Sequence, residues 1–212
     1  MPEIIEESLL DLLKTKAAAV GMKVAEVKNL DEAITYAVDV CDKKEMAQRY
    51  LKKDAAGKLV GLDQTEVIYA EKKTMAVTGL DDKSFASLSK QCAKKNIVVG
   101  RDNLRDWEWM AGHDVGFAVA DRVIADNPTL VIACLGENDR LALSVGEEYV
   151  VVAPKSKVVK TSFDIEDYLN DLMSGPMYTE FLSSSSRTAD IERVLAIGVH
   201  GSLVIHLVLT EE

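Results

Sequence analysis

Three consecutive segments near the middle of the chain constrain the fold most. Residues 73–80 and 96–102 are short runs rich in β-branched residues and bounded by Gly, Asp and Lys, which read KTMAVTGL and NIVVGRD. Such runs are typical of strands. Between them, Phe85, Leu88 and Cys92 recur at the spacing of one helical face. A strand, a helix and a strand at this spacing predict a parallel βαβ crossover, so we expect an α/β fold.

The second half of the chain again shows short predicted strands separated by turns and helices. Predicted strands cover residues 115–126, 129–136, 148–154 and 201–212, and predicted helices cover 137–145 and 163–174. An Asp-Asn-Pro turn at 126–128 should let the first two of these strands pair. The last strand shows little polar alternation, which predicts that both its faces are covered. With no linker, repeat or low-complexity tract, residues 1–212 are expected to form a single α/β domain.

The N-terminal quarter is predicted to be helical. The first twenty residues place apolar side chains at helical spacing, and Gly21 should end that helix. Residues 22–27 resemble a short strand. A second helix is expected over residues 29–53, where Ile34, Ala37, Val38 and Cys41 keep the helical period. Residues 1–55 are thus expected to be a helical N-terminal part of the same domain.

Charge and composition exclude several classes of partner. The 35 acidic side chains outnumber the 25 basic ones, which gives a net charge of −10, and the longest basic runs are pairs. Such a chain is repelled by nucleic acid and by anionic lipid surfaces. The first residues are acidic where a secretory signal needs positive charge, and no apolar segment approaches the length of a membrane span. We expect a cytoplasmic protein with no nucleic-acid partner and no membrane insertion.

No metal or cofactor motif stands out. Cys41, Cys92 and Cys134 lie far apart and form no C-x-x-C pair, so they are expected to be structural. His200 and His206 lack a third ligand at recognisable spacing for zinc. The chain also lacks the glycine patterns of dinucleotide and P-loop sites and the nucleophile elbow. We therefore expect no metal and no cofactor bound by this chain.

The most distinctive stretch lies near the C-terminus and reads SSSSRTADIERVLAIGVHG. Its serines predict a helix N-terminus capped by Ser186 or Thr188, where backbone N–H groups and Arg187 would favour an anion. Alternatively, Asp190 and Glu192 fall in the first helical turn and can satisfy the helix dipole and the arginine internally. The residues alone leave both interpretations open.

The histidines and the tryptophans are the other residues that could carry chemistry. His200, between glycines, is a candidate acid or base, with a structural histidine that anchors the loop as the alternative. His206 lies in the middle of a predicted strand, which favours a role in the core or on a sheet face. Trp107 and Trp109 are expected to pack in the core rather than to stack on a ligand. Residues 112–116, which include two glycines, are predicted to form a flexible turn before a strand.

The motifs SRTADIE and GVHG, followed by LVIHLVL, closely resemble the C-terminal pattern of the LUD-domain, lactate-utilisation protein C-like family, and a weaker resemblance covers residues 112–159. The resemblance implies the fold of the NagB, ribose-5-phosphate isomerase and CoA-transferase group, in which a mostly parallel sheet is flanked by helices. It also implies a role in bacterial oxidation of lactate to pyruvate beside partner subunits that carry iron–sulfur clusters. The chain departs from the family pattern at residues 119–128, where the family often has an acidic residue and a Thr-Gly-Thr-like turn, and at Ser184, Ser185 and Ser202, where it has Gly-Pro and Pro.

The leading hypothesis is therefore a small subunit or accessory protein of a lactate-oxidising system that binds a small carboxylate or phosphate anion. His200 is its candidate acid or base, and the predicted substrate-binding residues are Ser185, Ser186, Arg187, Thr188, Asp190, Glu192 and Gly201. A sugar-phosphate or folate-type enzyme on the same scaffold and a non-catalytic interaction module for iron–sulfur subunits are the alternatives. Whether the chain is an enzyme, which substrate it takes and whether it forms a homo-oligomer are left open by the sequence.

Overall fold

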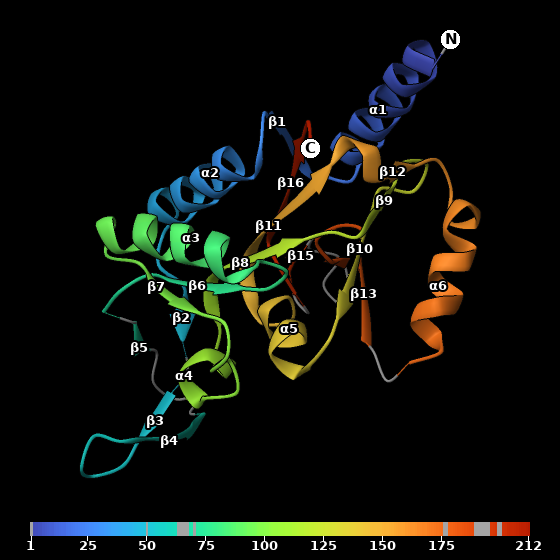
Figure 1. Cartoon of the computed structure of the whole chain (residues 1–212). Helices are drawn as coiled ribbons and strands as arrows, with labels where there is room; N and C mark the ends of the chain where they lie inside the picture. Colours follow the sequence, from blue (N-terminus) through green and yellow to red (C-terminus); the bar gives the residue numbers. More distant parts are fainter. Residues whose placement is uncertain are drawn as a thin grey trace.

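The computed structural model of the chain describes residues 2–49, 51–62, 68–69, 71–175, 178–188, 196–198 and 201–212. Its centre is a six-stranded sheet in which all neighbouring strands are parallel (Figure 1). In spatial order its strands are β1 (Lys23–Val27), β16 (Val204–Thr210), β11 (Gly146–Pro154), β8 (His113–Val119), β6 (Thr74–Val77) and β7 (Val98–Gly100). The mostly parallel sheet flanked by helices that the sequence predicts is therefore confirmed.

Two helices, α2 (Leu30–Lys43) and α3 (Asp82–Lys94), lie side by side on one face of this sheet (Figure 1). Both begin at a local signal, because the side chains of Asn29 and Asp81 accept a hydrogen bond from the backbone N–H three residues later. Helix α3 joins the parallel pair β6 and β7, so the predicted βαβ crossover is confirmed.

The other face of the sheet is covered by helix α1 (Pro2–Ala19) and by a second, four-stranded sheet. The strands of this second sheet, in spatial order, are β12 (Val158–Val159), β9 (Arg122–Ile124), β10 (Thr129–Cys134) and β13 (Tyr178–Leu182). Strands β9 and β10 pair antiparallel around the predicted Asp-Asn-Pro turn. Helix α6 (Glu166–Met173), preceded by the 3₁₀ turn Ser162–Ile165, packs on the outer face of the second sheet.

Strand β11 shows how the main sheet separates two cores. Val150 packs with Ile34 of α2 on one side of the sheet. The next residue, Val151, packs with Leu13 of α1 and Leu130 of β10 on the other side. Alternate side chains of a strand point to opposite faces, and here both faces are apolar. The same holds for β16, whose coverage on both faces the sequence predicts.

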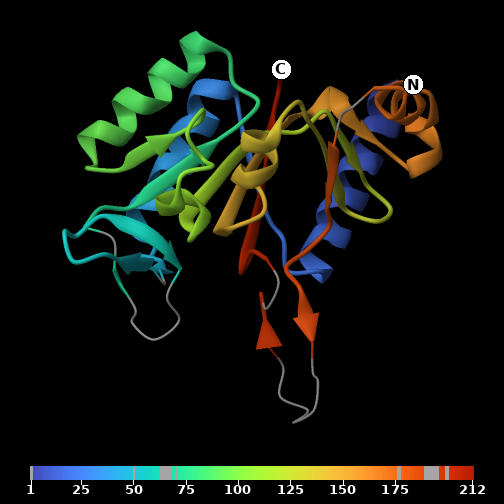
Figure 2. The same ribbon diagram turned by 90° about the horizontal axis from the view of Figure 1, so that it is seen from below.

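The remaining elements are short. They are helices α4 (Trp107–Met110) and α5 (Glu137–Ala142), the 3₁₀ turn Lys155–Lys157, and strands β2 (Gln48–Arg49), β3 (Leu51–Lys53), β4 (Leu59–Leu62), β5 (Ile68–Tyr69), β14 (Arg187–Thr188) and β15 (Ala196–Ile197). Strands β14 and β15 form an antiparallel pair that projects away from both sheets (Figure 2). None of the helices built from described residues is long and apolar enough to cross a membrane.

The predicted extent of the second helix is wrong. Helix α2 ends at Lys43, and strands β2 and β3 follow within the range expected to be helical up to residue 55. The cause is tertiary: the Lys44 ammonium and the Ala47 N–H both turn toward the buried carboxylate of Asp114. That the whole chain forms one domain stays a prediction.

The turn expected at residues 112–116 is also wrong beyond its first residue. His113 begins the central strand β8, and His113 and Asp114 are both buried. Gly116 serves close packing instead, because a Cβ there would clash with the backbone at the end of α5 and with the ring of Tyr149. Trp109 is buried in the core as predicted, as are the three cysteines.

Candidate functional site

A cavity of about 290 Å³ lies between the main sheet and strand β13 of the second sheet. It is bounded by the amino-terminal ends of β11 and β16. Its lining residues are Leu143, Ser144, Tyr149, Glu180, Leu182, Ser184, Ser186, Gly201, Ser202 and Ile205. Two predicted site residues, Ser186 and Gly201, are thus brought together by the fold although they lie far apart in the sequence.

The serines after β13 divide into two sets. The hydroxyl oxygens of Ser183 and Thr129 are 2.8 Å apart, and the Ser185 hydroxyl donates to the carbonyl of Leu203 at 2.7 Å. Ser184 and Ser186 line the cavity. This alternation is the period of an extended chain, in which neighbouring side chains point to opposite sides. Ser185, a predicted substrate-binding residue, is therefore fastened to the final strand and is not part of the cavity lining.

Glu180 enters the cavity from β13, which pairs antiparallel with β10. Its cross-strand partner is Ile132, a core residue that points inward between the two sheets. Partial burial raises the pKa of Glu180, while the nearby Arg140 acts in the opposite direction. A carboxyl group in this position accepts hydrogen bonds when ionised and donates one when protonated.

Tyr149 and Ser144 form the wall beside Glu180. The Tyr149 side chain is almost fully buried, and its hydroxyl accepts a hydrogen bond from the Gly146 N–H at 3.2 Å. Burial raises the pKa of this phenol above its usual value, so it stays neutral. The Ser144 hydroxyl donates to the carbonyl of Arg140 at 2.7 Å, which leaves its oxygen able to accept. The described wall thus offers hydroxyl groups and one carboxyl group.

The described residues of the family motif include two short antiparallel strands, and Ser186 and Gly201 on either side of them line the cavity. Arg187 pairs with Ile197 across β14 and β15, and the Gly198 N–H donates to the Ser186 carbonyl at 2.8 Å. The prediction of a helix capped by Ser186 is therefore wrong. The two residues after Ser186 lie in β14, which its pairing with β15 holds extended. Gly198 has a φ of +72°, and a Cβ there would lie 2.6 Å from the Leu203 side chain.

The other predicted site residues are only partly described. Of Arg187 and Thr188, the structure describes the backbone, which lies in β14. Asp190, Glu192 and His200 lie outside the described residues, as does the helix start that the sequence predicts with Thr188 as its cap. Their predicted roles stay predictions.

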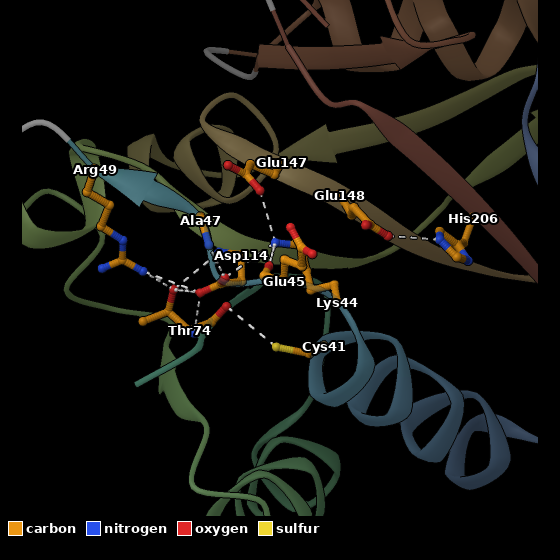
Figure 3. Close-up of polar contacts among 10 residues, drawn as sticks. All are labelled: Cys41, Lys44, Glu45, Ala47, Arg49, Thr74, Asp114, Glu147, Glu148 and His206. Atoms are coloured by element: carbon orange, nitrogen blue, oxygen red, sulfur yellow. Dashed lines mark hydrogen bonds and ion pairs between the residues drawn. The ribbon is translucent and has the colours of Figure 1, made fainter. Parts of the chain in front are cut away.

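A second polar centre, which the sequence analysis missed, is built around Asp114 on β8 (Figure 3). Its carboxylate is fully buried and accepts hydrogen bonds from the Ala47 N–H at 2.7 Å and from the Thr74 N–H and hydroxyl at 2.8 and 3.0 Å. Two cations lie next to it, the Lys44 ammonium at 3.4 Å and the Arg49 guanidinium at 3.5 Å. Asp114 therefore ties the segment after α2 to the central strands.

The cations of this centre are engaged elsewhere too. The Lys44 ammonium also donates to the carbonyl of Glu45 and to the carboxylate of Glu147, at 2.6 and 2.9 Å. Burial lowers the pKa of Arg49, and the nearby Asp114 opposes that shift. Arg49 is 1% exposed and also donates to the Thr74 hydroxyl. We interpret this centre as a structural anchor, because its carboxylate and its cations are occupied with one another.

His206 forms a third polar centre on the same sheet (Figure 3). Its Nε2 lies 3.2 Å from the Glu148 carboxylate, and its Nδ1 lies 2.8 Å from the Tyr36 hydroxyl of α2. A carboxylate only accepts, so Nε2 carries a proton and donates to Glu148, and Nδ1 shares the second hydrogen bond with the tyrosine hydroxyl. The expected place of His206 on a sheet face is confirmed, since it is 4% exposed and contacts α2.

Within the described part of the chain, no group of three or more His, Cys, Asp and Glu side chains could hold a metal ion.

A parallel sheet between a helical layer and a second small sheet, with a hydroxyl-lined cavity between the sheets, defines the architecture of this α/β protein. The chain belongs to the LUD domain family, whose sequence model matches residues 10–210. The family resemblance seen in the sequence is therefore confirmed.

Curated relatives carry the same name, lactate utilization protein C. The protein from Shouchella clausii is 28% identical over 149 residues, which are 67% of this chain and 64% of that protein. Those from Exiguobacterium sp. and Geobacillus thermodenitrificans are each 28% identical, over 47% and 55% of this chain and 45% and 49% of the relative. The matched part of this chain spans about half to two thirds of the length of these relatives.

A solved structure supports the fold. The crystal structure of a DUF162 family protein from Deinococcus radiodurans superposes with a TM-score of 0.62 at 11% identity. It covers 97% of this chain and 98% of its own, so the likeness extends over the whole α/β architecture.

Proposed function

We propose that this chain is a cytoplasmic small subunit or accessory protein of a bacterial system that oxidises lactate to pyruvate. Membership of the LUD domain family and relatives named lactate utilization protein C support this role. The observation that carries it is the cavity between the two sheets, because the family motif borders it through Ser186 and Gly201.

The ligand of this cavity is proposed to be a small carboxylate or phosphate anion. The volume of about 290 Å³ lies at the lower end of the range for small-molecule sites, which suits a ligand of a few heavy atoms. Ser184 and Ser186 would donate hydroxyl hydrogen bonds from the hairpin side. Arg187 would supply the positive charge, and His200 would act as acid or base.

Titration calorimetry of the full chain with lactate, pyruvate and inorganic phosphate tests this assignment. The Arg187→Ala and Ser186→Ala variants are expected to weaken binding, Arg187→Ala by about 10-fold or more because a charge-assisted hydrogen bond is lost. Ser185→Ala is the matched control, since that hydroxyl donates to the Leu203 carbonyl outside the cavity. Unchanged binding in Arg187→Ala would refute its role. Binding of a sugar phosphate, titrated in parallel, without binding of lactate, pyruvate or inorganic phosphate would favour the sugar-phosphate enzyme.

The partners are proposed to be subunits that carry iron–sulfur clusters. Affinity purification of the tagged chain from a native host grown on lactate should recover proteins with the visible absorption of such clusters. Recovery of these partners together with a failure to bind any tested anion would favour the non-catalytic interaction module. Failure to recover them would remove the subunit role from the proposal.

A further inference from the structure

We propose that Glu180 is the specificity-determining residue of the cavity and that it recognises a hydroxyl group, so that the ligand class is a 2-hydroxy carboxylate. This role rests on the proposed function, because both concern the same cavity. Glu180 lies outside the family motif, on β13, which precedes the serines.

The composition of the cavity wall carries this inference. Among the lining residues that the structure describes, Glu180 bears the one carboxyl group, and the other polar side chains are the hydroxyl groups of four serines and Tyr149. None of these described lining side chains is basic. An anionic group placed against an ionised Glu180 would be repelled, whereas a neutral hydroxyl can donate to it.

The position of Glu180 is fixed by the strand that carries it. Cross-strand pairing sets Glu180 opposite Ile132 and Leu182 opposite Leu130, so alternation directs both β13 side chains toward the space between the sheets. The Glu180 carboxyl group therefore lies on one wall of the cavity, and Ser184 and Ser186 lie further along the same chain.

This arrangement gives the ligand an orientation. The hydroxyl group of a 2-hydroxy acid would face Glu180 and Ser144. Its carboxylate would face Ser186, where the chain leads into Arg187. The two ends of a single small molecule then meet a carboxyl group and a hydroxyl-rich end, which matches the two functional groups of the acid.

Partial burial raises the pKa of the Glu180 carboxyl group and so opposes its ionisation, and the nearby Arg140 counteracts part of this shift. An ionised Glu180 accepts from a ligand hydroxyl but has no proton to give to a ketone oxygen. A site built to hydrogen-bond a hydroxyl rejects an analogue that lacks it, because the buried partner is left unpaired.

Calorimetry with lactate, pyruvate and propionate tests the role of Glu180 at neutral pH. Propionate has the size and charge of lactate but no hydroxyl group. The wild-type protein is expected to bind lactate about 10- to 100-fold more tightly than propionate, the range expected for one hydrogen bond to a charged group. Pyruvate is expected to bind more weakly than lactate.

Variants locate the preference. Glu180→Leu should bind lactate and propionate with similar affinity, whereas Glu180→Gln, which can still accept from a hydroxyl, should keep part of the preference. Phe181→Leu is the control, because its half-exposed side chain points to the opposite side of the same strand. Circular dichroism and thermal unfolding will show whether each variant is folded. If Glu180→Leu does not fold, Glu180→Gln still tests the role, because it should reduce the preference for lactate.

The outcomes separate the two proposals. Equal binding of lactate and propionate by the wild-type protein, or an undiminished lactate preference in a folded Glu180→Leu, would overturn the role of Glu180 and leave the proposed function standing. A wild-type protein that binds none of the three acids would overturn the proposed ligand and the role of Glu180 together. A lactate preference that disappears in Glu180→Leu and persists in Phe181→Leu would support the role.

Discussion

Asp114→Ala is expected to destabilise the fold strongly, because this carboxylate holds two buried cations. Its side chain is fully buried, and it accepts from two backbone N–H groups, those of Ala47 and Thr74. Alanine would leave the ammonium of Lys44 and the guanidinium of Arg49, with side chains 8% and 1% exposed, without their shared counter-ion.

The expected loss of unfolding free energy follows from these buried contacts. Removing one partner of a buried ion pair costs about 3–5 kcal/mol, and the orphaned N–H groups place Asp114→Ala at the upper end of that range. For a chain of 212 residues this corresponds to a fall in melting temperature of roughly 6–20 °C. It is a large share of a typical unfolding free energy of about 5–15 kcal/mol.

Urea unfolding followed by circular dichroism measures the effect. Glu137→Ala is the control, since Glu137 pairs with Arg140 on the surface and exposed pairs contribute about 1 kcal/mol or less. A double-mutant cycle of Asp114→Asn with Arg49→Met should show a coupling energy of about 1–3 kcal/mol. An Asp114→Ala protein within about 1 kcal/mol of wild type, or strictly additive effects in the cycle, would refute the reasoning.

Three more predictions concern Gly116 and His113, which are buried, and Tyr36, which is partly buried. Gly116→Ala should cost about 3 kcal/mol in urea unfolding, because the new Cβ meets backbone and an aromatic ring, whereas Gly136→Ala, with open space around it, should stay within about 1 kcal/mol. Burial lowers the pKa of His113 to about 4, so the unfolded chain binds the extra proton first. Stability should therefore fall by about 3 kcal/mol between pH 6.5 and 4, and a folded His113→Gln that keeps the same slope would contradict this. Tyr36→Phe should lose about 1 kcal/mol with its hydrogen bond to His206, and an unchanged urea midpoint would show that the bond contributes nothing.

Local signals explain why much of the fold could be predicted. The crossover through α3 needs an N-cap at Asp81, an apolar face and two flanking β-rich runs, all within thirty residues of sequence. Helix α2 was overextended for the opposite reason. Its end is set by Lys44 and Ala47, which contact Asp114, a residue 70 and 67 positions away in sequence. No periodicity in the sequence reports such a contact.

The candidate site, too, could be predicted from the sequence only in part. The motif around Ser186 could be found from the sequence, but its backbone conformation could not, because β14 is held extended by β15 across a hairpin. The division of the serines into bonded and cavity-facing sets depends on that extended conformation. Glu180 did leave a signal, because it is an acid that alternates with Tyr178 and Leu182 on one face of a short strand. The sequence does not show what this face contacts. The structure shows that the second sheet places it against the main sheet, so that Glu180 lines the cavity.

The position of the cavity is unusual for a parallel sheet, and the structure gives a reason. Ligands of open α/β sheets generally bind beyond the carboxyl ends of the strands. At that end here, the Thr78 hydroxyl after β6 donates to Asp139 of α5, and Asp121 after β8 accepts from the Ala133 N–H of β10. These polar groups fasten α5 and the second sheet to the main sheet. Attachment of the second sheet in turn brings β13 and Glu180 over the amino-terminal ends of β11 and β16, so the space left between the sheets is the place where a small ligand can meet both the carboxyl group and the family motif.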